Sequence, residues 1–215
     1  MYRSEEDYLK TIYELTVESK RSQVKNVEIA HQLGHSDQSV NEKIRKLEAK
    51  EYVVFEPYRG VSLTEKGLQE AIRMVRAHRL WEVFLFQELE FSWSDLHQDA
   101  EELEHASSER VVTKLYHYLN APDYCYHGNP IPDLDGQVKA MAWRGLASLE
   151  VGEVFVLNRV LDQKELLEFL DERNLKIGSK LTVLEKNEFA SLITVASKKD
   201  TISIPTTIAS MIFTF

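Results

Sequence analysis

The sequence predicts an α+β chain with an N-terminal winged helix-turn-helix, a helical middle region and a small C-terminal SH3-like β-barrel. Amphipathic helices and then a β-hairpin pattern occupy residues 1–66. Helical periodicity dominates residues 67–140, and short strand-like runs fill residues 141–215. We therefore expect three domains with these boundaries.

The first domain reads as three short helices followed by two strands. Apolar residues recur at helical spacing in 8–15 and 27–33, where Gly34 ends the second helix. Ser36 or Asp37 can cap a third helix that ends near Lys50. The strands are expected at 52–56 and 61–63 around the turn 57–60, and Thr64 caps the next helix.

In this layout the third helix would enter the major groove of DNA. We expect base-edge contacts from the polar residues near its start and phosphate contacts from the basic ones and from the hairpin tip. The residues are Gln38, Ser39, Asn41 and Glu42 for bases, and Lys43, Arg45, Lys46 and Arg59 for phosphates. The alternative is a small helical domain whose basic surface contacts no DNA.

The middle region predicts long helices over Arg73–Glu90, Ser94–Ala106 and Glu109–Leu119. These helices offer more apolar surface than one domain needs, so a dimerisation role is expected. The region is also the acidic part of the chain, with 6 Lys/Arg against 13 Asp/Glu between residues 67 and 140.

Histidines and carboxylates share one helical stripe in this region. His97, Glu101, Glu104 and His105 stand at i, i+4, i+7 and i+8, and such a set suits a divalent cation better than an apolar contact. A solvated acidic face with incidental histidines is the alternative. His78 and Glu82, at i and i+4, form a second ligand-competent pair, although a structural role is more common for such a pair.

A Pro- and Gly-rich loop over 120–132 holds the single cysteine. Cys125 and His127 are two residues apart, so in extended backbone both side chains would point the same way and could bind Zn²⁺, Fe²⁺ or Mn²⁺. A buried cysteine with an exposed histidine is the alternative. Beyond the loop, a helix is expected at 163–173, and strands at 153–159, 181–184, 192–196, 201–204 and 211–215.

Composition narrows the class of protein. The 215 residues carry a formal net charge of −9, which argues against a generally basic nucleic-acid binder. One cysteine excludes an internal disulfide framework and suggests a reducing, cytoplasmic setting. We expect neither a membrane span nor a signal peptide, because no apolar run has the required length.

Several short motifs, taken with their order and spacing, resemble the diphtheria-toxin-repressor family of metal-dependent transcriptional regulators. They are Glu6-Asp7-Tyr8-Leu9, the winged helix at 24–63, Ala77–Leu85, Leu103-Glu104-His105 and Gly128–Pro132. The C-terminal part is similar to the ferrous-transport-protein-A-like SH3 module of longer members. The resemblance covers essentially the full length, and it implies a homodimeric repressor of metal-uptake genes that binds double-stranded operator DNA when loaded with metal.

The resemblance also implies two metal sites. Asp7, Glu101, Glu104 and His105 match one site, with Asp7 and Glu101 standing where the iron-responsive branch has methionine and cysteine. Glu82, Cys125, His127 and Asp162 match the other, as in streptococcal manganese-responsive members. His78 and His97 match ligands of the iron-responsive branch and are accessory candidates.

The ligand chemistry favours Mn²⁺, with Fe²⁺ and Zn²⁺ as alternatives. The first set is rich in hard oxygen ligands, whereas Cys125 adds one soft ligand to the second. Two departures from the family stand out. Lys10 occupies the place of a glutamate ligand in the shorter manganese sensors, which argues against a binuclear site, and Ser36–Ser39 lacks the usual prolines, so the operator can differ.

Two other function classes remain. Glu101–His105 superficially matches the H-x-x-E-H peptidase motif, but Glu101 replaces its first histidine, so we expect no metallohydrolase and no enzyme. A winged-helix regulator that answers to an organic ligand is the closer alternative. We expect no organic cofactor and no membrane partner.

Overall fold

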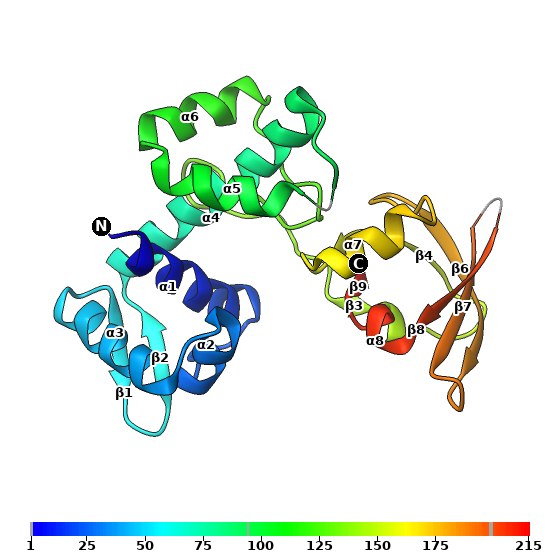
Figure 1. The fold of residues 1–215 in the computed structure, drawn as a ribbon, viewed down its shortest axis with the longest axis horizontal. Coiled ribbons are helices and arrows are strands. Elements are labelled where there is room, and N and C mark those ends of the chain that lie inside the picture. Colours follow the sequence, from blue (N-terminus) through cyan, green and yellow to red (C-terminus); the bar gives the residue numbers. More distant parts are fainter. Residues whose placement is uncertain (1, 94, 198–199) are drawn as a thin grey trace. The chain divides into compact units, whose positions relative to one another are not determined.

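The structure, a computed structural model, describes residues 2–93, 95–197 and 200–215 (Figure 1). The chain divides into two compact units: unit 1 contains Met1–His78, Glu102–Leu115 and Pro132–Gln137, and unit 2 contains the remaining residues. Several boundaries between the two units fall inside helices, so the units do not correspond to the three expected domains. The boundaries at residues 66 and 140 stay predictions.

Unit 1 contains the winged helix-turn-helix that the sequence predicts. Its elements are α1 (Arg3–Tyr13), the π-helical segment η1 (Glu14–Glu18), α2 (Asn26–Leu33), α3 (Asp37–Ala49), β1 (Val53–Glu56) and β2 (Gly60–Leu63). The two strands pair antiparallel, with Val53 opposite Leu63. One apolar core joins these elements, and Leu9, Ile12, Val40 and Leu47 are among its buried members.

The structure confirms the residues that were expected to cap the helices. Gly34 follows α2 with φ +65°, a left-handed conformation that glycine adopts without strain. The Ser36 hydroxyl accepts a hydrogen bond from the Ser39 N–H at the start of α3. Thr64 Oγ1 accepts the Gly67 N–H at 3.0 Å where α4 (Glu65–Leu89) begins. The sequence places a separate helix from Arg73, but α4 continues through that point as one 25-residue helix.

The middle helices follow the periodicity closely. α5 spans Leu96–Ala106 and α6 spans Glu109–Tyr118, and with α4 they contribute residues to both units. The predicted first residue of α5, Ser94, lies outside the described residues. In the ranges 2–93, 95–197 and 200–215, no helix is long and apolar enough to cross a membrane.

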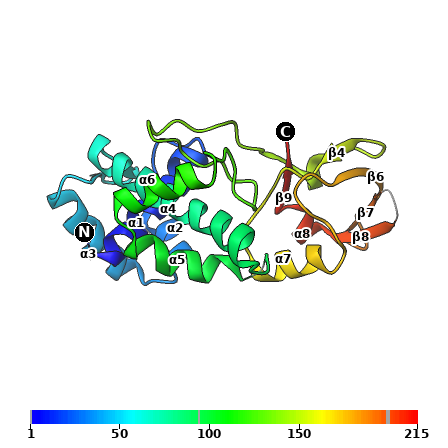
Figure 2. The ribbon, with the colours of Figure 1, turned by 90° about the horizontal axis from the view of Figure 1, so that it is seen from above.

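The C-terminal part of unit 2 is strand-rich, as expected for an SH3-like module (Figure 2). Its elements are β3 (Arg144–Gly145), η2 (Leu146–Ser148), β4 (Val154–Val156), β5 (Arg159–Val160), α7 (Lys164–Asp171), β6 (Lys180–Asn187), β7 (Leu192–Ala196), β8 (Thr201–Pro205), α8 (Thr206–Ala209) and β9 (Ile212–Thr214). The strands form two sheets, ordered β3-β9-β5 and β4-β6-β7-β8.

The expectation of five strands with one helix was wrong for this module. Within its described residues there are seven strands, the two α-helices α7 and α8, and the short 3-10 helix η2. The run 153–159, expected as one strand, is divided between the two sheets: Val154–Val156 pairs with β6, whereas Arg159–Val160 pairs with β9. Two-residue strands such as β3 and β5 are too short to leave an alternating pattern in the sequence.

Gly67 gives a test of the packing between α4 and the hairpin. A Cβ at this position would lie 1.9 Å from the Tyr52 carbonyl oxygen, a backbone atom. Glycine-to-alanine changes inside helices ordinarily stabilise by about 1 kcal/mol. Here we expect Gly67→Ala to lower the free energy of unfolding by about 1–3 kcal/mol, the usual penalty of overpacking. Denaturant titration measures it.

The control is Gln69→Ala, at an exposed position two residues further along α4. It should change the free energy of unfolding by less than about 0.5 kcal/mol. Stabilisation by Gly67→Ala would show that α4 does not approach Tyr52 this closely.

Candidate metal centres

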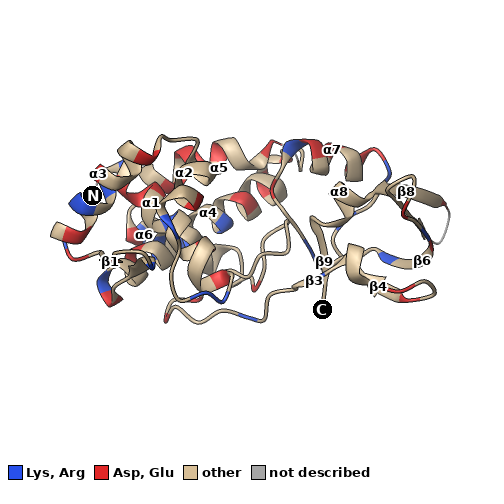
Figure 3. Ribbon diagram, turned by 90° about the horizontal axis from the view of Figure 1, so that it is seen from below, with Lys and Arg blue, Asp and Glu red and all other residues tan. Residues whose placement is uncertain are grey.

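The first candidate centre, the His105 site, is the set Asp7, Glu101, Glu104 and His105. In unit 1, α1 supplies Asp7 and α5 supplies Glu104 and His105, and these three offer ligand atoms within 4.8 Å of one another. Glu101 lies three residues before Glu104 on α5, on the neighbouring turn of that helix. Acidic residues recur along α5 (Figure 3).

A hydrogen bond fixes the ring of His105. Nδ1 lies 2.7 Å from Glu6 Oε2, and because a carboxylate oxygen accepts, Nδ1 is the donor of this contact. Nε2 lies 2.8 Å from Asp7 Oδ1, an ion-pair contact between the two side chains. An imidazole nitrogen and carboxylate oxygens grouped this closely are ligand types that divalent cations accept, so the chemistry of the His105 site suits a metal ion.

Glu104 lies in the most enclosed part of this cluster, with none of its surface exposed. Lys10 Nζ donates to both of its carboxylate oxygens, at 3.0 and 2.9 Å. His78 Nδ1 lies 2.5 Å from Glu104 Oε2 and 3.1 Å from Lys10 Nζ. A carboxylate, an ammonium and an imidazole therefore share one buried contact.

The second candidate centre, the Cys125 site, is the set Glu82, Cys125, His127 and Asp162, all in unit 2. Glu82 comes from α4, and Cys125 and His127 come from the 120–132 loop; these three offer ligand atoms within 4.8 Å of one another. His127 Nδ1 lies 3.1 Å from Glu82 Oε1 and 3.8 Å from Asp162 Oδ2. All three of Glu82, Cys125 and His127 are buried.

The expectation of extended backbone at Cys125 and His127 was wrong. The segment is a turn, closed by the Gly128 N–H donating to the Cys125 carbonyl at 2.9 Å. Gly128 has φ +78°, and a Cβ there would lie 1.9 Å from the Asn158 carbonyl oxygen. A larger residue would push the turn away from residues 158–160, where the Val160 N–H donates to the His127 carbonyl at 2.9 Å.

Burial and charge act together on the two loop ligands. Burial, and then the Glu82 carboxylate, raise the pKa of the Cys125 thiol, although the His127 hydrogen bond partly opposes them. Burial alone would lower the pKa of His127, but Glu82, the Cys125 hydrogen bond and Asp162 together raise it well above its usual value. His127 Nε2 is buried and, within the described residues, has no hydrogen-bond partner. This donor set fits a metal ion.

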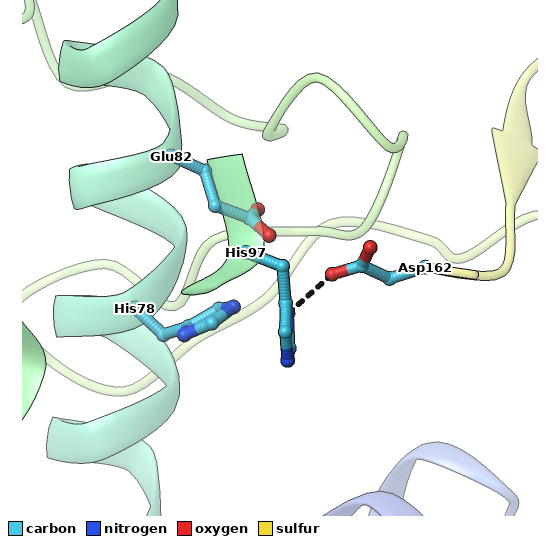
Figure 4. A group of neighbouring side chains, drawn as sticks. All are labelled: His78, Glu82, His97 and Asp162. Carbon is cyan, nitrogen blue, oxygen red and sulfur yellow. Dashed lines mark ion pairs between the residues drawn. The ribbon is translucent and has the colours of Figure 1, made fainter. Parts of the chain in front are cut away.

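Asp162 also contacts His97, an accessory candidate (Figure 4). Its Oδ2 lies 2.5 Å from His97 Nδ1, closer than to His127. His97 Nε2 lies 3.9 Å from Glu101 Oε2, one turn along α5. The stripe of α5 therefore does not form one site: His97 meets Asp162, whereas Glu104 and His105 meet α1.

Two residues in contact with these centres, Glu6 and Trp93, carry no individual signal in the sequence. Glu6 belongs to an acidic run that reads as an exposed helix start, but it is buried against His105 and Arg73. Trp93 stacks on the His127 ring, with centroids 6.1 Å apart and planes 15° apart. It also lines a cavity of about 710 Å³ that reaches Cys125.

The candidate DNA-binding residues lie on α3 and at the hairpin tip. All are exposed except Lys43, which is half-buried and donates to Ser4 Oγ at 2.7 Å. Asn41 accepts from Asn26 Nδ2, Gln38 donates to Glu42, and Arg59 pairs with Glu56. Their surface is compatible with contact to DNA, and their individual roles stay predictions.

Models of three protein domains match the chain. Residues 1–61 match "Iron dependent repressor, N-terminal DNA binding domain", residues 64–133 match "Iron dependent repressor, metal binding and dimerisation domain", and residues 144–214 match "FeoA domain". A solved "manganese-dependent transcriptional repressor complex with manganese" is 33% identical, with a TM-score of 0.88 over 98% of both chains.

The chain belongs to the iron-dependent repressor family. It is therefore a metal-dependent, DNA-binding transcriptional repressor and not an enzyme, which confirms the resemblance and the predicted function class. The structure of the manganese regulator SloR is also similar, at 35% identity and a TM-score of 0.79 over 97% of this chain and 96% of that one.

Curated relatives are matched over part of their length. The iron-dependent repressor IdeR of Mycobacterium tuberculosis (strain H37Rv) is 36% identical over 129 residues, which are 60% of this repressor and 55% of IdeR. A probable metal transport system membrane protein of Chlamydia trachomatis is 45% identical over 71 residues, 33% of this chain and 16% of that protein.

The single cysteine of the repressor allows a direct test of the Cys125 environment. Because Cys125 is buried and its pKa is raised, an aromatic disulfide reagent should label the folded, metal-free chain at least about tenfold more slowly than the unfolded chain. The pH of half-maximal labelling should also be higher for the folded chain, since thiolate forms at higher pH. Equal rates with and without denaturant would contradict the burial.

Proposed function

We propose that this repressor binds operator DNA as a homodimer when a divalent cation, in the first place Mn²⁺, is bound at the His105 and Cys125 sites. The observation that carries the proposal is the convergence of Glu82, Cys125 and His127, with ligand atoms within 4.8 Å and a buried ring nitrogen that has no hydrogen-bond partner in the described residues. Few buried polar atoms stay unpartnered unless something else satisfies them.

The metal preference rests on ligand type. Asp7, Glu101, Glu104 and His105 offer three carboxylates and one imidazole, and oxygen-rich sets suit Mn²⁺. Cys125 makes Fe²⁺ and Zn²⁺ the alternatives at the other site. Zn²⁺ would bind either set more tightly than Mn²⁺ under equal supply, so selectivity for Mn²⁺ has to come from geometry and cellular availability. Two similar structures are a manganese-dependent repressor in complex with manganese and the manganese regulator SloR.

The switch works through the residues that the sites connect. When bound, a divalent cation supplies the positive charge that offsets the mutual repulsion of the clustered carboxylates. Asp7 lies on the first helix of the DNA-binding region and Glu104 and His105 lie on α5, so ligation by these residues holds α1 to α5. Glu82, Cys125, His127 and Asp162 hold α4, the 120–132 loop and the segment before α7 together in the same way.

DNA recognition follows from a fixed spacing of two α3 helices. Two-fold symmetric helix-turn-helix dimers read half-sites about one DNA turn, roughly 34 Å, apart. Metal ligation would favour the dimer arrangement with that spacing over a looser ensemble. On this proposal the repressed genes encode metal uptake, because a repressor that is active when metal is plentiful would then close a feedback loop.

The central test is operator binding with Mn²⁺ and with a chelator. We expect Mn²⁺ to raise the affinity of the wild-type repressor about 5- to 150-fold, a coupling of roughly 1–3 kcal/mol. Glu104→Ala and His127→Ala should each remove most of that difference, whereas His117→Ala, at an exposed position of α6, should keep it. Fluorescence anisotropy with a labelled operator measures each affinity.

Equal operator affinity of the wild type in Mn²⁺ and in chelator would overturn the proposal. It would favour a regulator that answers to an organic ligand, and thermal unfolding would separate the two, since only a ligand that binds the folded chain raises its midpoint.

A second test concerns α3. Lys46→Ala should weaken binding to all sequences alike and reduce the slope of log affinity against log salt by about 1. Gln38→Ala should instead lower discrimination at one base pair by about 1–3 kcal/mol. Lys180→Ala, at an exposed position of β6, is the charge control and should leave the slope unchanged.

A further inference from the structure

We propose that Lys10 is an internal cation that sets the metal affinity of the His105 site by holding its ligand Glu104. The inference rests on the proposed function, in which that site binds a divalent cation. It assigns to Lys10 a role that is not ligation: the ammonium competes with the metal for the same carboxylate.

The contacts of Lys10 are those of a counter-ion built into the core. Nζ lies 3.0 and 2.9 Å from the two oxygens of Glu104 and 3.1 Å from His78 Nδ1. An ammonium has three N–H donors, and two of them can donate to the two oxygens of Glu104. Only 10% of the Lys10 side chain and none of the Glu104 side chain is exposed, so little water screens the pair.

This arrangement is unfavourable for a metal ion at the His105 site. Glu104 Oε1 lies 3.6 Å from His105 Nε2, close enough for the two to share a metal ion, but the carboxylate charge of Glu104 is already paired with Lys10. A metal ion bound by these residues would also lie near a fixed positive charge in a buried place. Both effects lower the affinity of the site.

At the Cys125 site, the carboxylate is contacted by another proposed ligand. Its Glu82 carboxylate is hydrogen-bonded to His127, which is itself a proposed ligand of the same metal. Its members therefore hold one another until metal arrives, whereas Glu104 is held by a residue outside the ligand set. From this contrast we infer that Lys10 is what weakens metal binding at the His105 site.

The experiment measures Mn²⁺ binding by the full chain carrying His127→Ala, which removes the Cys125 site and leaves the His105 site to be read alone. Titration calorimetry, with free Mn²⁺ followed by electron paramagnetic resonance, gives the affinity. Replacing Lys10 by methionine, which keeps the length and removes the charge, should tighten Mn²⁺ binding at least about tenfold.

Arg3→Met is the matched control. Arg3 lies on the same helix and also ion-pairs with α5, through Glu102 at 2.7 Å, but its side chain is 49% exposed. Solvent screens such a pair, so Arg3→Met should leave Mn²⁺ affinity within about twofold of the parent. The inference is overturned if Lys10→Met leaves the Mn²⁺ affinity unchanged or weakens it. It is also overturned if neither the His127→Ala parent nor its Lys10→Met variant binds Mn²⁺.

Thermal unfolding separates this role from a structural one. Without metal, Lys10→Met should lower the unfolding midpoint, because the buried Glu104 carboxylate loses its ion pair with Lys10. Saturating Mn²⁺ should then raise the midpoint more in Lys10→Met than in the parent. A lysine that only supports the fold would give the same deficit with and without Mn²⁺, and that result contradicts the proposal.

Lys10→Gln covers the case in which Lys10→Met does not fold without metal, since its amide can still donate to Glu104. It should tighten Mn²⁺ binding in the same direction, and an unchanged affinity overturns the inference. Operator binding by the wild type tests the proposed function separately: Mn²⁺-dependent binding there, with no effect of Lys10 on Mn²⁺ affinity, would reject this inference alone.

Discussion

The burial of the Glu104 carboxylate is the constraint on which the organisation of unit 1 depends. A buried charge is costly unless opposite charge or hydrogen bonds surround it, and removing its partner typically destabilises by about 3–5 kcal/mol. Here the partners come from α1 through Lys10 and from α4 through His78, so compensating one charge fixes three helices. Arg73 on α4, which ion-pairs with Glu6 on α1, adds a second tie between the same helices. The first helix of the DNA-binding region is thereby held by charged groups as well as by its apolar core.

Unit 2 depends on a different kind of tie, made largely by backbone. The turn that presents Cys125 and His127 lies against residues 158–160, where only glycine fits at position 128. The His127 carbonyl accepts the Val160 N–H, and Arg159 donates to Asn129 Oδ1 and to the Ala142 carbonyl. The position of the His127 ring is therefore set by the strand-rich module, and Asp162, two residues beyond Val160, follows directly from the same segment. Any change that loosens this module will move two members of the Cys125 site together.

Local rules accounted for most of the elements but for few of the contacts. Periodicity and capping predicted α1 to α3, the hairpin, α5 and α6, because each of these is encoded within about a dozen neighbouring residues. They placed a separate helix from Arg73, where α4 in fact runs on unbroken, and they missed the close backbone approach of Tyr52 to Gly67. They could not find the contact of Lys10 with Glu104, because 94 residues separate the two. The ligand sets came from the family resemblance, and Glu6 was hidden in a run of acids typical of an exposed helix start.

The two centres solve the same electrostatic problem with different cations. In each centre a carboxylate is buried, and an uncompensated charge there would be costly. The His105 site uses the ammonium of Lys10, which ion-pairs with Glu104 at 2.9 Å. At the Cys125 site the cations are protons. The pKa values of His127 and Cys125 are both raised, so these two groups bind their protons more tightly than they would in water. Under the proposed function a metal ion therefore meets two kinds of competitor. Raising the pH removes protons from the Cys125 cluster and so favours metal binding by Cys125 and His127, whereas at the His105 site the competitor is a side chain of the protein itself, in ion-pair contact with Glu104.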